Sequence, residues 1–165
     1  MADRREMFER ALAPEPGRTA LVVVDMQRGF LDLGEPMEVP PAREVVPVIR
    51  ALLDLFRAKD LPRRAPRVGE LVVRKRGYDA FAGTPLDGAL RARNVTSLVV
   101  TGTMTDICVL ATVIGALHRE SRVTVVEDGV ATLWPEIQRA ALDIIGRAYG
   151  RVVTGKEVAD QISKW

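Results

Sequence analysis

The chain has 165 residues, of which 47% are hydrophobic and 28% are charged, and its formal net charge is +2. We expect one globular domain over residues 1–165, with a polar arm at 1–18. The small net charge and the lack of an apolar run of about 18 residues argue against nucleic-acid and membrane partners. A single cysteine, and an arm without the apolar core of a signal peptide, point to the cytoplasm.

Short apolar runs rich in β-branched residues alternate along the chain with longer amphipathic runs. In chain order they predict a strand at 21–24, a helix at 45–58, a strand at 71–73, a helix at 84–93, a strand at 98–101, a helix at 106–119, a strand at 123–126, a helix at 135–149, a strand at 151–153 and a helix at 155–162. Strands that are apolar throughout are covered on both faces. The pattern therefore predicts a three-layer α/β/α fold around a parallel sheet.

One strand of this alternation is missing. The first predicted helix ends near Asp60, and residues 63–70 form a largely polar segment in place of a buried strand. We therefore expect a missing strand between Pro62 and Arg63. Either the chain lacks it, or these two residues are not joined by a peptide bond and their Cα atoms lie farther apart than about 3.8 Å.

Cys108 is the only cysteine, and it lies in the segment GTMTDICV at 102–109, where a predicted strand turns into a predicted helix. With Thr105 as the N-cap, Cys108 would be the third helical residue. The unpaired N–H groups and the helix dipole favour a thiolate there. The alternative is a buried structural cysteine, since free cysteines are often buried.

Three reactive side chains follow predicted strands: Asp25, Lys75 and Cys108. The carboxyl ends of parallel strands meet at one edge of the sheet, where ligands bind. Taken singly, Asp25 could be a turn residue and Lys75 a solvated cation. His118, the only histidine, lies ten residues beyond Cys108, roughly 15 Å along a helix, and is too far to serve as its base. Asp25 is therefore the candidate base, with Lys75 keeping it ionised and favouring the thiolate.

Three motifs, in this order, resemble the isochorismatase-like cysteine hydrolases. They are LVVVDMQ at 21–27; Lys75 with YDAF at 78–81 and TPL at 84–86; and GTMTDICV at 102–109 with Thr112. The group includes nicotinamidases, N-carbamoylsarcosine amidohydrolases and ureidoacrylate amidohydrolases, and the resemblance covers residues 19–162. It implies the sheet order 3-2-1-4-5-6, a catalytic triad of Asp25, Lys75 and Cys108, and no cofactor.

The resemblance also implies a cis peptide bond between Thr103 and Met104, and an oxyanion hole made by the backbone N–H groups of Met104 and Cys108. The residues that it places near the substrate are Gln27, Phe30, Tyr78, Phe81 and Thr103. Core packing is the alternative for the three aromatic residues. Nicotinamidases bind a metal through an Asp/His cluster, but this chain has no histidine before His118, so we expect no metal site.

The expected reaction is hydrolysis of a C–N bond in a small amide or ureido substrate, through a covalent thioester on Cys108. Two alternatives remain: an isochorismatase-type hydrolase with other chemistry, such as ether cleavage, and a catalytically silent member of the fold that acts as a binding or assembly subunit. Trp134, in the turn before the helix at 135–149, is hard to bury in a small domain. Together with the resemblance, it predicts a homo-oligomer, most simply a two-fold dimer, with Trp134 near the interface.

Overall fold

The computed structural model describes residues 10–64 and 70–165. Within these residues, five parallel strands form one sheet in the order β2-β1-β3-β4-β5. The strands are β1 (Thr19–Val24), β2 (Arg63–Arg64), β3 (Ser97–Thr103), β4 (Arg122–Ala131) and β5 (Arg151–Val153). The helical elements are α2 (Arg28–Leu31), the 3₁₀ turn η1 (Pro40–Arg43), α3 (Val46–Ala58), α4 (Leu86–Arg91), the π-helical turn η2 (Thr105–Val109), α5 (Leu110–Leu117), α6 (Pro135–Ala148) and α7 (Gly155–Ile162).

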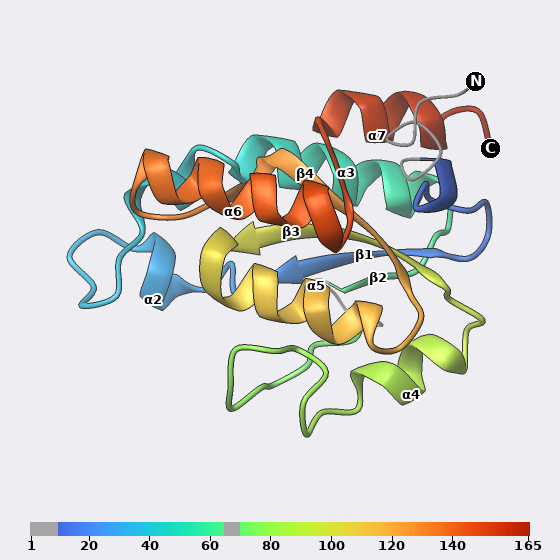
Figure 1. Ribbon diagram of the computed structural model, residues 1–165, viewed down its shortest axis with the longest axis horizontal. Helices are drawn as coiled ribbons and strands as arrows, with labels where there is room; N and C mark the ends of the chain where they lie inside the picture. Colours follow the sequence, from blue (N-terminus) through green and yellow to red (C-terminus); the bar gives the residue numbers. More distant parts are fainter. Residues whose placement is uncertain (1–9, 65–69) are drawn as a thin grey trace.

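Helices cover both faces of the sheet (Figure 1). Even-numbered residues of β1, such as Val22, pack with α4, α5 and α6, whereas Leu21 packs with α3 and α7. Successive side chains of a strand point to opposite faces, so a run of valines and leucines fills both cores. The predicted three-layer parallel α/β fold is confirmed. No helix in the described part of the chain is long and apolar enough to cross a membrane.

Most predicted elements agree with the structure at nearly the predicted bounds. β5 and α7 match the prediction, and α3 begins one residue later. β4 continues beyond 123–126 to Ala131, because its register against β3 shifts between Val100 and Gly102 and pairing then resumes. Three elements were not predicted: α2, η1 and β2. Each has four residues or fewer, which is too short for a hydrophobic period to be visible.

The strand predicted at 71–73 is wrong. These residues have no strand assignment, and Val72 is 61% exposed. The place beside β1 is taken by β2, with Leu21 paired to Arg63 and Val22 to Arg64. In the described residues, the sheet therefore lacks the outermost strand, strand 3, of the predicted order 3-2-1-4-5-6. An apolar run without a neighbouring strand to pair with cannot extend the sheet.

The predicted break in the chain is also wrong. The carbonyl of Pro62 accepts a hydrogen bond from the Leu21 N–H at 3.0 Å, and Arg63 pairs with the same Leu21. Pro62 and Arg63 therefore follow each other along β1. The chain passes directly into the two-residue strand β2.

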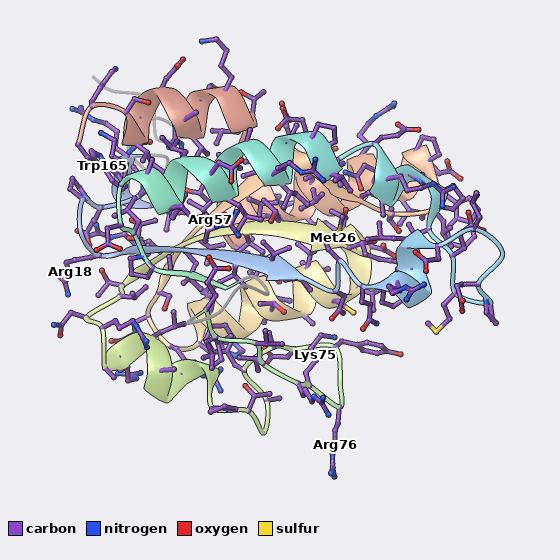
Figure 2. All side chains as sticks on the ribbon, turned by 180° about the vertical axis from the view of Figure 1, so that it is seen from behind. Arg18, Met26, Arg57, Lys75, Arg76 and Trp165 are labelled. Carbon is purple, nitrogen blue, oxygen red and sulfur yellow. The ribbon has the colours of Figure 1, made fainter. Side chains whose placement is uncertain are left out.

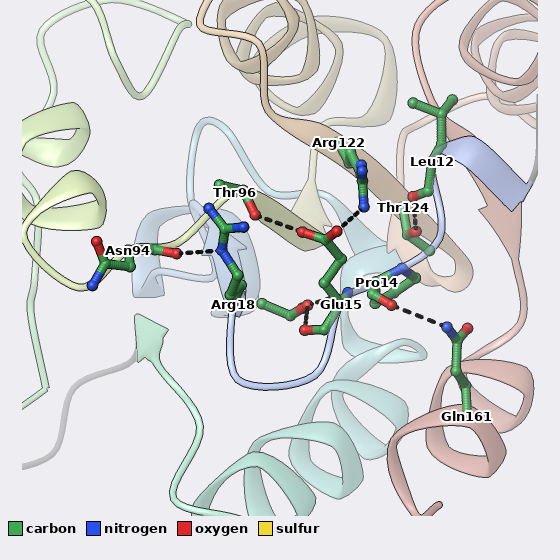
Figure 3. Close-up of polar contacts among 10 residues, drawn as sticks. Leu12, Pro14, Glu15, Arg18, Asn94, Thr96, Arg122, Thr124 and Gln161 are labelled. Carbon is green, nitrogen blue, oxygen red and sulfur yellow. Dashed lines mark hydrogen bonds and ion pairs between the residues drawn. The ribbon is translucent and has the colours of Figure 1, made fainter. Parts of the chain in front are cut away.

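The described part of the N-terminal arm lies at the amino ends of β3 and β4 (Figure 3). Asp25 follows the other end of β1. Glu15 is the main anchor of the arm. The Thr96 hydroxyl donates to the Glu15 carboxylate at 2.8 Å, and Arg122 pairs with it. The backbone of the arm is also held, since Thr124 donates to the carbonyl of Leu12 and Gln161 to that of Pro14.

We expect Glu15→Gln to destabilise the protein at pH 7 by about 1–2 kcal/mol. The hydrogen bond from Thr96, with the charge of Arg122, holds the pKa of Glu15 below its usual value. A carboxyl whose pKa is lowered on folding stabilises the fold above its unfolded pKa of about 4.3, and this contribution disappears as the pH falls through the lower folded pKa. Urea unfolding at pH 7 and pH 3 should show the difference shrinking at the lower pH. The exposed Glu35 gives the control substitution, Glu35→Gln, and an equal loss in both variants would contradict the anchor.

Candidate active site

Asp25, Lys75 and Cys108 lie together at the carboxyl edge of the sheet. Asp25 follows β1 directly, and Cys108 lies in η2, just after β3. The Lys75 Nζ lies 2.6 Å from the Asp25 Oδ2 and donates to the Cys108 Sγ at 3.5 Å. The side chains of Lys75 and Asp25 are 14% and 16% exposed, and Cys108 is buried. The ammonium group therefore contacts the carboxylate and the thiol in a largely enclosed place.

The view from behind places Lys75 along the molecule (Figure 2). Met26 and Lys75 lie toward the end where β1 finishes, whereas Arg18 and Trp165 lie toward the opposite end. Arg76 is exposed and points away from the molecule. Lys75 was predicted to follow a strand but lies in an irregular segment, so loop contacts, such as its hydrogen bond to the carbonyl of Gly77 at 2.9 Å, help to hold it.

The backbone below the site is unusually close-packed. Asp25 has a positive φ of 49°, and Gly102 has a φ of +116°. A Cβ on Gly102 would overlap the main chain of Val24, the residue before Asp25. Only glycine allows β1 and β3 to approach this closely in that conformation. Gly102 was not predicted to have this role, although a glycine inside an apolar strand is a signal for such an approach.

The turn that carries Cys108 differs from the predicted helix start. The carbonyl of Met104 accepts from the N–H groups of Ile107 and Val109, which makes a wide π-type turn before α5. Thr105 is therefore not the N-cap, and its buried hydroxyl has no hydrogen-bond partner in the described part of the chain. The Thr103–Met104 peptide bond is cis, as the resemblance implied. π-type turns such as η2 are frequent at functional sites.

The pKa of Cys108 is shifted in the direction opposite to the favoured thiolate that its place in the turn predicted. Burial, followed by the hydrogen bond and charge of Asp25, raises the pKa of Cys108, and the opposing effect of Lys75 is smaller. Burial acts to lower the pKa of Lys75, but the hydrogen bond and charge of Asp25 raise it overall. Burial and Asp25 therefore act on the thiol in the direction opposite to Lys75.

The remaining residues that the sequence placed near the substrate fall into two groups. Gln27 is exposed before α2, and Tyr78 is 66% exposed. Phe30 is partly buried against the core cluster between η1 and the end of β4. The polar side chain of Gln27 and the ring of Tyr78 are thus open to a ligand.

Phe81 and Thr103 are directed into the fold. Phe81 is 3% exposed, and the guanidinium of Arg119 lies 4.8 Å from the centre of its ring. This position agrees with the core-packing alternative. The hydroxyl of Thr103 is buried and donates to the carbonyl of Ala131 at 3.0 Å. This hydrogen bond joins β3 to β4 just before the turn that carries Cys108.

Three residues fix the segment after Lys75: Asp79 and Thr112, which belong to the quoted motifs but had no role assigned, and Gly115, which was not predicted. Asp79 accepts from the Phe81 N–H at 2.8 Å, and the Ala80 N–H donates to the Thr112 hydroxyl at 3.1 Å. A Cβ on Gly115 would lie 2.5 Å from the Asp79 Oδ1. The loop is therefore held against α5, the helix that continues from Cys108. Contacts between residues more than 30 positions apart leave no local pattern.

Histidine and metal ligands are not part of this arrangement. His118 is exposed at the C-terminal end of α5. Over residues 10–64 and 70–165, no group of three or more His, Cys, Asp and Glu side chains is placed to hold a metal ion.

Comparison with known sequences gives consistent relatives. The ureidoacrylate amidohydrolase RutB of Methylobacterium radiotolerans is 43% identical over 88 residues, which are 53% of this chain and 34% of that protein. The RutB protein of an Enterobacter species is 36% identical over 99 residues, covering 59% of this chain and 43% of that protein. The matched part therefore spans less than half the length of these curated relatives.

Solved structures match over nearly the whole chain. A cysteine hydrolase from Pseudomonas syringae pv. phaseolicola has a TM-score of 0.84 at 27% identity, with 92% of this chain and 95% of that chain covered. N-carbamoylsarcosine amidase from Thermoplasma acidophilum has a TM-score of 0.75 at 29% identity, covering 84% and 96%. The family model described as "Isochorismatase domain" matches residues 61–157, more than half of the chain. The chain belongs to the isochorismatase family.

Proposed function

We propose that this chain is a cysteine hydrolase that cleaves the C–N bond of a small amide or ureido substrate through a thioester on Cys108. The observation that carries the proposal is the contact of one ammonium group, that of Lys75, with both the Asp25 carboxylate and the Cys108 sulfur. A thiol next to a base is a nucleophile that can be activated when substrate arrives. The relatives named as ureidoacrylate amidohydrolases and as an N-carbamoylsarcosine amidase support a C–N bond as the target.

The proposed reaction has two halves. In the first, Asp25 takes the thiol proton of Cys108 while the sulfur attacks the substrate carbonyl. The tetrahedral intermediate collapses, and ammonia or an amine leaves with the proton returned by Asp25. In the second half, Asp25 deprotonates a water molecule, which attacks the thioester; the acid is released, and Asp25 returns the proton to the sulfur to regenerate the Cys108 thiol. The ammonium group of Lys75, which contacts both Asp25 and the sulfur, offsets the negative charge that develops on sulfur.

The developing oxyanion requires donors fixed in advance. We assign this role to the backbone N–H groups of Met104 and Cys108, which lie in the turn held by the Met104 carbonyl. Donors of this kind contribute about 10²–10³-fold in turnover in enzymes where one has been removed. The proposed substrate contacts are Gln27 and Tyr78, which are both exposed. We assign a packing role behind the substrate to Phe30, Phe81 and Thr103, which are partly or fully buried.

The test is a screen for ammonia release over small amides, ureido acids and nicotinamide, combined with intact-mass analysis under rapid quench. Hydrolysis with an acyl adduct on Cys108 would support the proposal. Cleavage of a vinyl ether without an adduct would favour the isochorismatase-type alternative. A folded protein that releases no product and forms no adduct would favour a silent binding or assembly subunit.

The raised pKa of Cys108 makes a prediction for its reactivity. We expect alkylation by iodoacetamide to accelerate with pH through a midpoint above the usual thiol value of about 8.5. Because Asp25 raises this pKa and Lys75 lowers it, Asp25→Asn should move the midpoint down and Lys75→Met should move it up. A wild-type midpoint below pH 8.5 would mean that Lys75 and the turn lower the pKa of Cys108 by more than burial and Asp25 raise it.

We also propose that the protein is a two-fold dimer in contact through α6. Trp134, just before α6, is 53% exposed, and Ile137 and Ile144 on the same helix are 37% and 48% exposed. Burial of such side chains is a usual driving force of homodimers. Light scattering should give about 36 kDa, twice the 18.1 kDa of the chain, and Ile144→Glu should reduce the mass to that of the monomer. A wild-type monomer at micromolar concentration would exclude the dimer.

A further inference from the structure

A cavity of about 420 Å³ lies beside the edge of β1. Three consecutive strand residues, Val22–Val24, form one side of it, and residues 71–73 also line it. Asp25 and Lys75 line it too. Because the ammonium group of Lys75 donates to the sulfur of Cys108, one residue of the cavity wall contacts the thiol directly. Its size is that of a small-molecule site.

The cavity lies beside the part of β1 that continues beyond its described pairing with β2. The described pairing of β1 with β2 ends at Val22 and Arg64, although β1 continues for two more residues. Residues 71–73, which read as a strand in the sequence, do not pair with β1 and instead lie across the cavity from it. The cavity therefore follows the extended backbone of β1 over Val22–Val24, with residues 71–73 also on its wall.

The lining of the cavity is mostly apolar. Val22, Val24, Val73, Ala80 and Leu86 belong to the core cluster under α4 and α5 or pack against it. The charged lining residues are Asp25 and Lys75, which pair with each other, and Arg28, whose 93% exposed side chain pairs with Asp32. The described part of the wall therefore presents hydrocarbon, with its ionic groups already paired.

We propose that this cavity binds the acyl part of the substrate and selects primary amides with an extended aliphatic chain. This inference rests on the proposed function, because it places the amide carbonyl at Cys108 and the chain along β1. The hydrolysis is R–CO–NH₂ + H₂O → R–COOH + NH₃, with R in the cavity. A small ligand suits the space better than a protein strand, because the cavity leads to the paired Asp25 and Lys75, which an added strand would have to displace.

The test is a series of straight-chain amides. Each buried methylene contributes about a fourfold gain in affinity. We therefore expect kcat/KM to rise at least tenfold from acetamide to hexanamide. Leu71 lines the cavity and is only partly buried, so Leu71→Trp should fill the space and reduce the ratio of hexanamide to acetamide at least fivefold. The matched control is Met37→Trp, at a residue that is 66% exposed and outside the cavity lining, which should leave the ratio unchanged.

Binding to Cys108→Ala, measured by ligand-observed NMR, separates the two proposals. If the wild type hydrolyses no amide, the proposed function fails, and tighter binding of hexanamide than of acetamide, lost in Leu71→Trp, would still support the cavity. Equal hydrolysis and equal binding along the series would overturn the inference. So would a chain-length preference that Leu71→Trp leaves intact.

Discussion

Cys108→Ala is expected to give a folded protein whose turnover is reduced at least about 10³-fold. The substitution removes a buried sulfur but no backbone contact, and alanine suits a helical turn. Without the sulfur no thioester can form, and the remaining groups can only orient substrate. Turnover of the best amide from the screen, with circular dichroism as the check on folding, measures the effect.

Asp25→Asn should reduce turnover by a similar factor, since an amide cannot accept the thiol proton. The double variant should lose little more than either single one, because groups that act as one unit are strongly non-additive. His118→Ala is the control, as His118 is exposed at the far end of α5. Most of the activity surviving in Cys108→Ala or Asp25→Asn would refute the proposed roles.

The fold was predictable because its signals are local. Continuous runs such as 98–100 can only be strands covered on both sides, and the amphipathic period of α3 is visible over 13 residues. The same reasoning failed at 71–73, where the run has the composition of a strand. Whether an apolar run becomes a strand depends on its neighbours as well as its composition, and in the described residues β1 pairs on this side with β2.

The three reactive side chains of the candidate site could be predicted from the sequence, but the contacts that hold them in place could not. Asp25 and Cys108 follow strands, so the topology alone brings them together. Lys75 reaches them from an irregular segment that is held by Asp79, Thr112 and Gly115. The raised pKa of Cys108 also depends on how deeply the thiol is buried, which no residue spacing reveals.

Gly102→Ala is expected to destabilise the protein by at least about 3 kcal/mol, because two costs add at one position. The φ of +116° is unfavourable for any residue with a Cβ, and that Cβ would overlap the main chain of Val24. The strands cannot separate there without breaking the pairing of Val24 with Gly102. Urea unfolding followed by circular dichroism measures the loss.

The matched control is Gly88→Ala in α4, where a Cβ meets nothing within 4 Å and a helical alanine should stabilise by up to about 1 kcal/mol. Gly102→Ala should also reduce turnover under conditions where it remains folded, because Asp25 follows Val24, and Thr103 and Met104 follow Gly102. A variant as stable and as active as the wild type would mean that the close approach of β1 and β3 is not what fixes the carboxylate next to the thiol. A stable variant with reduced turnover would separate the two roles of this glycine, leaving it to position the triad while the rest of the sheet holds the fold.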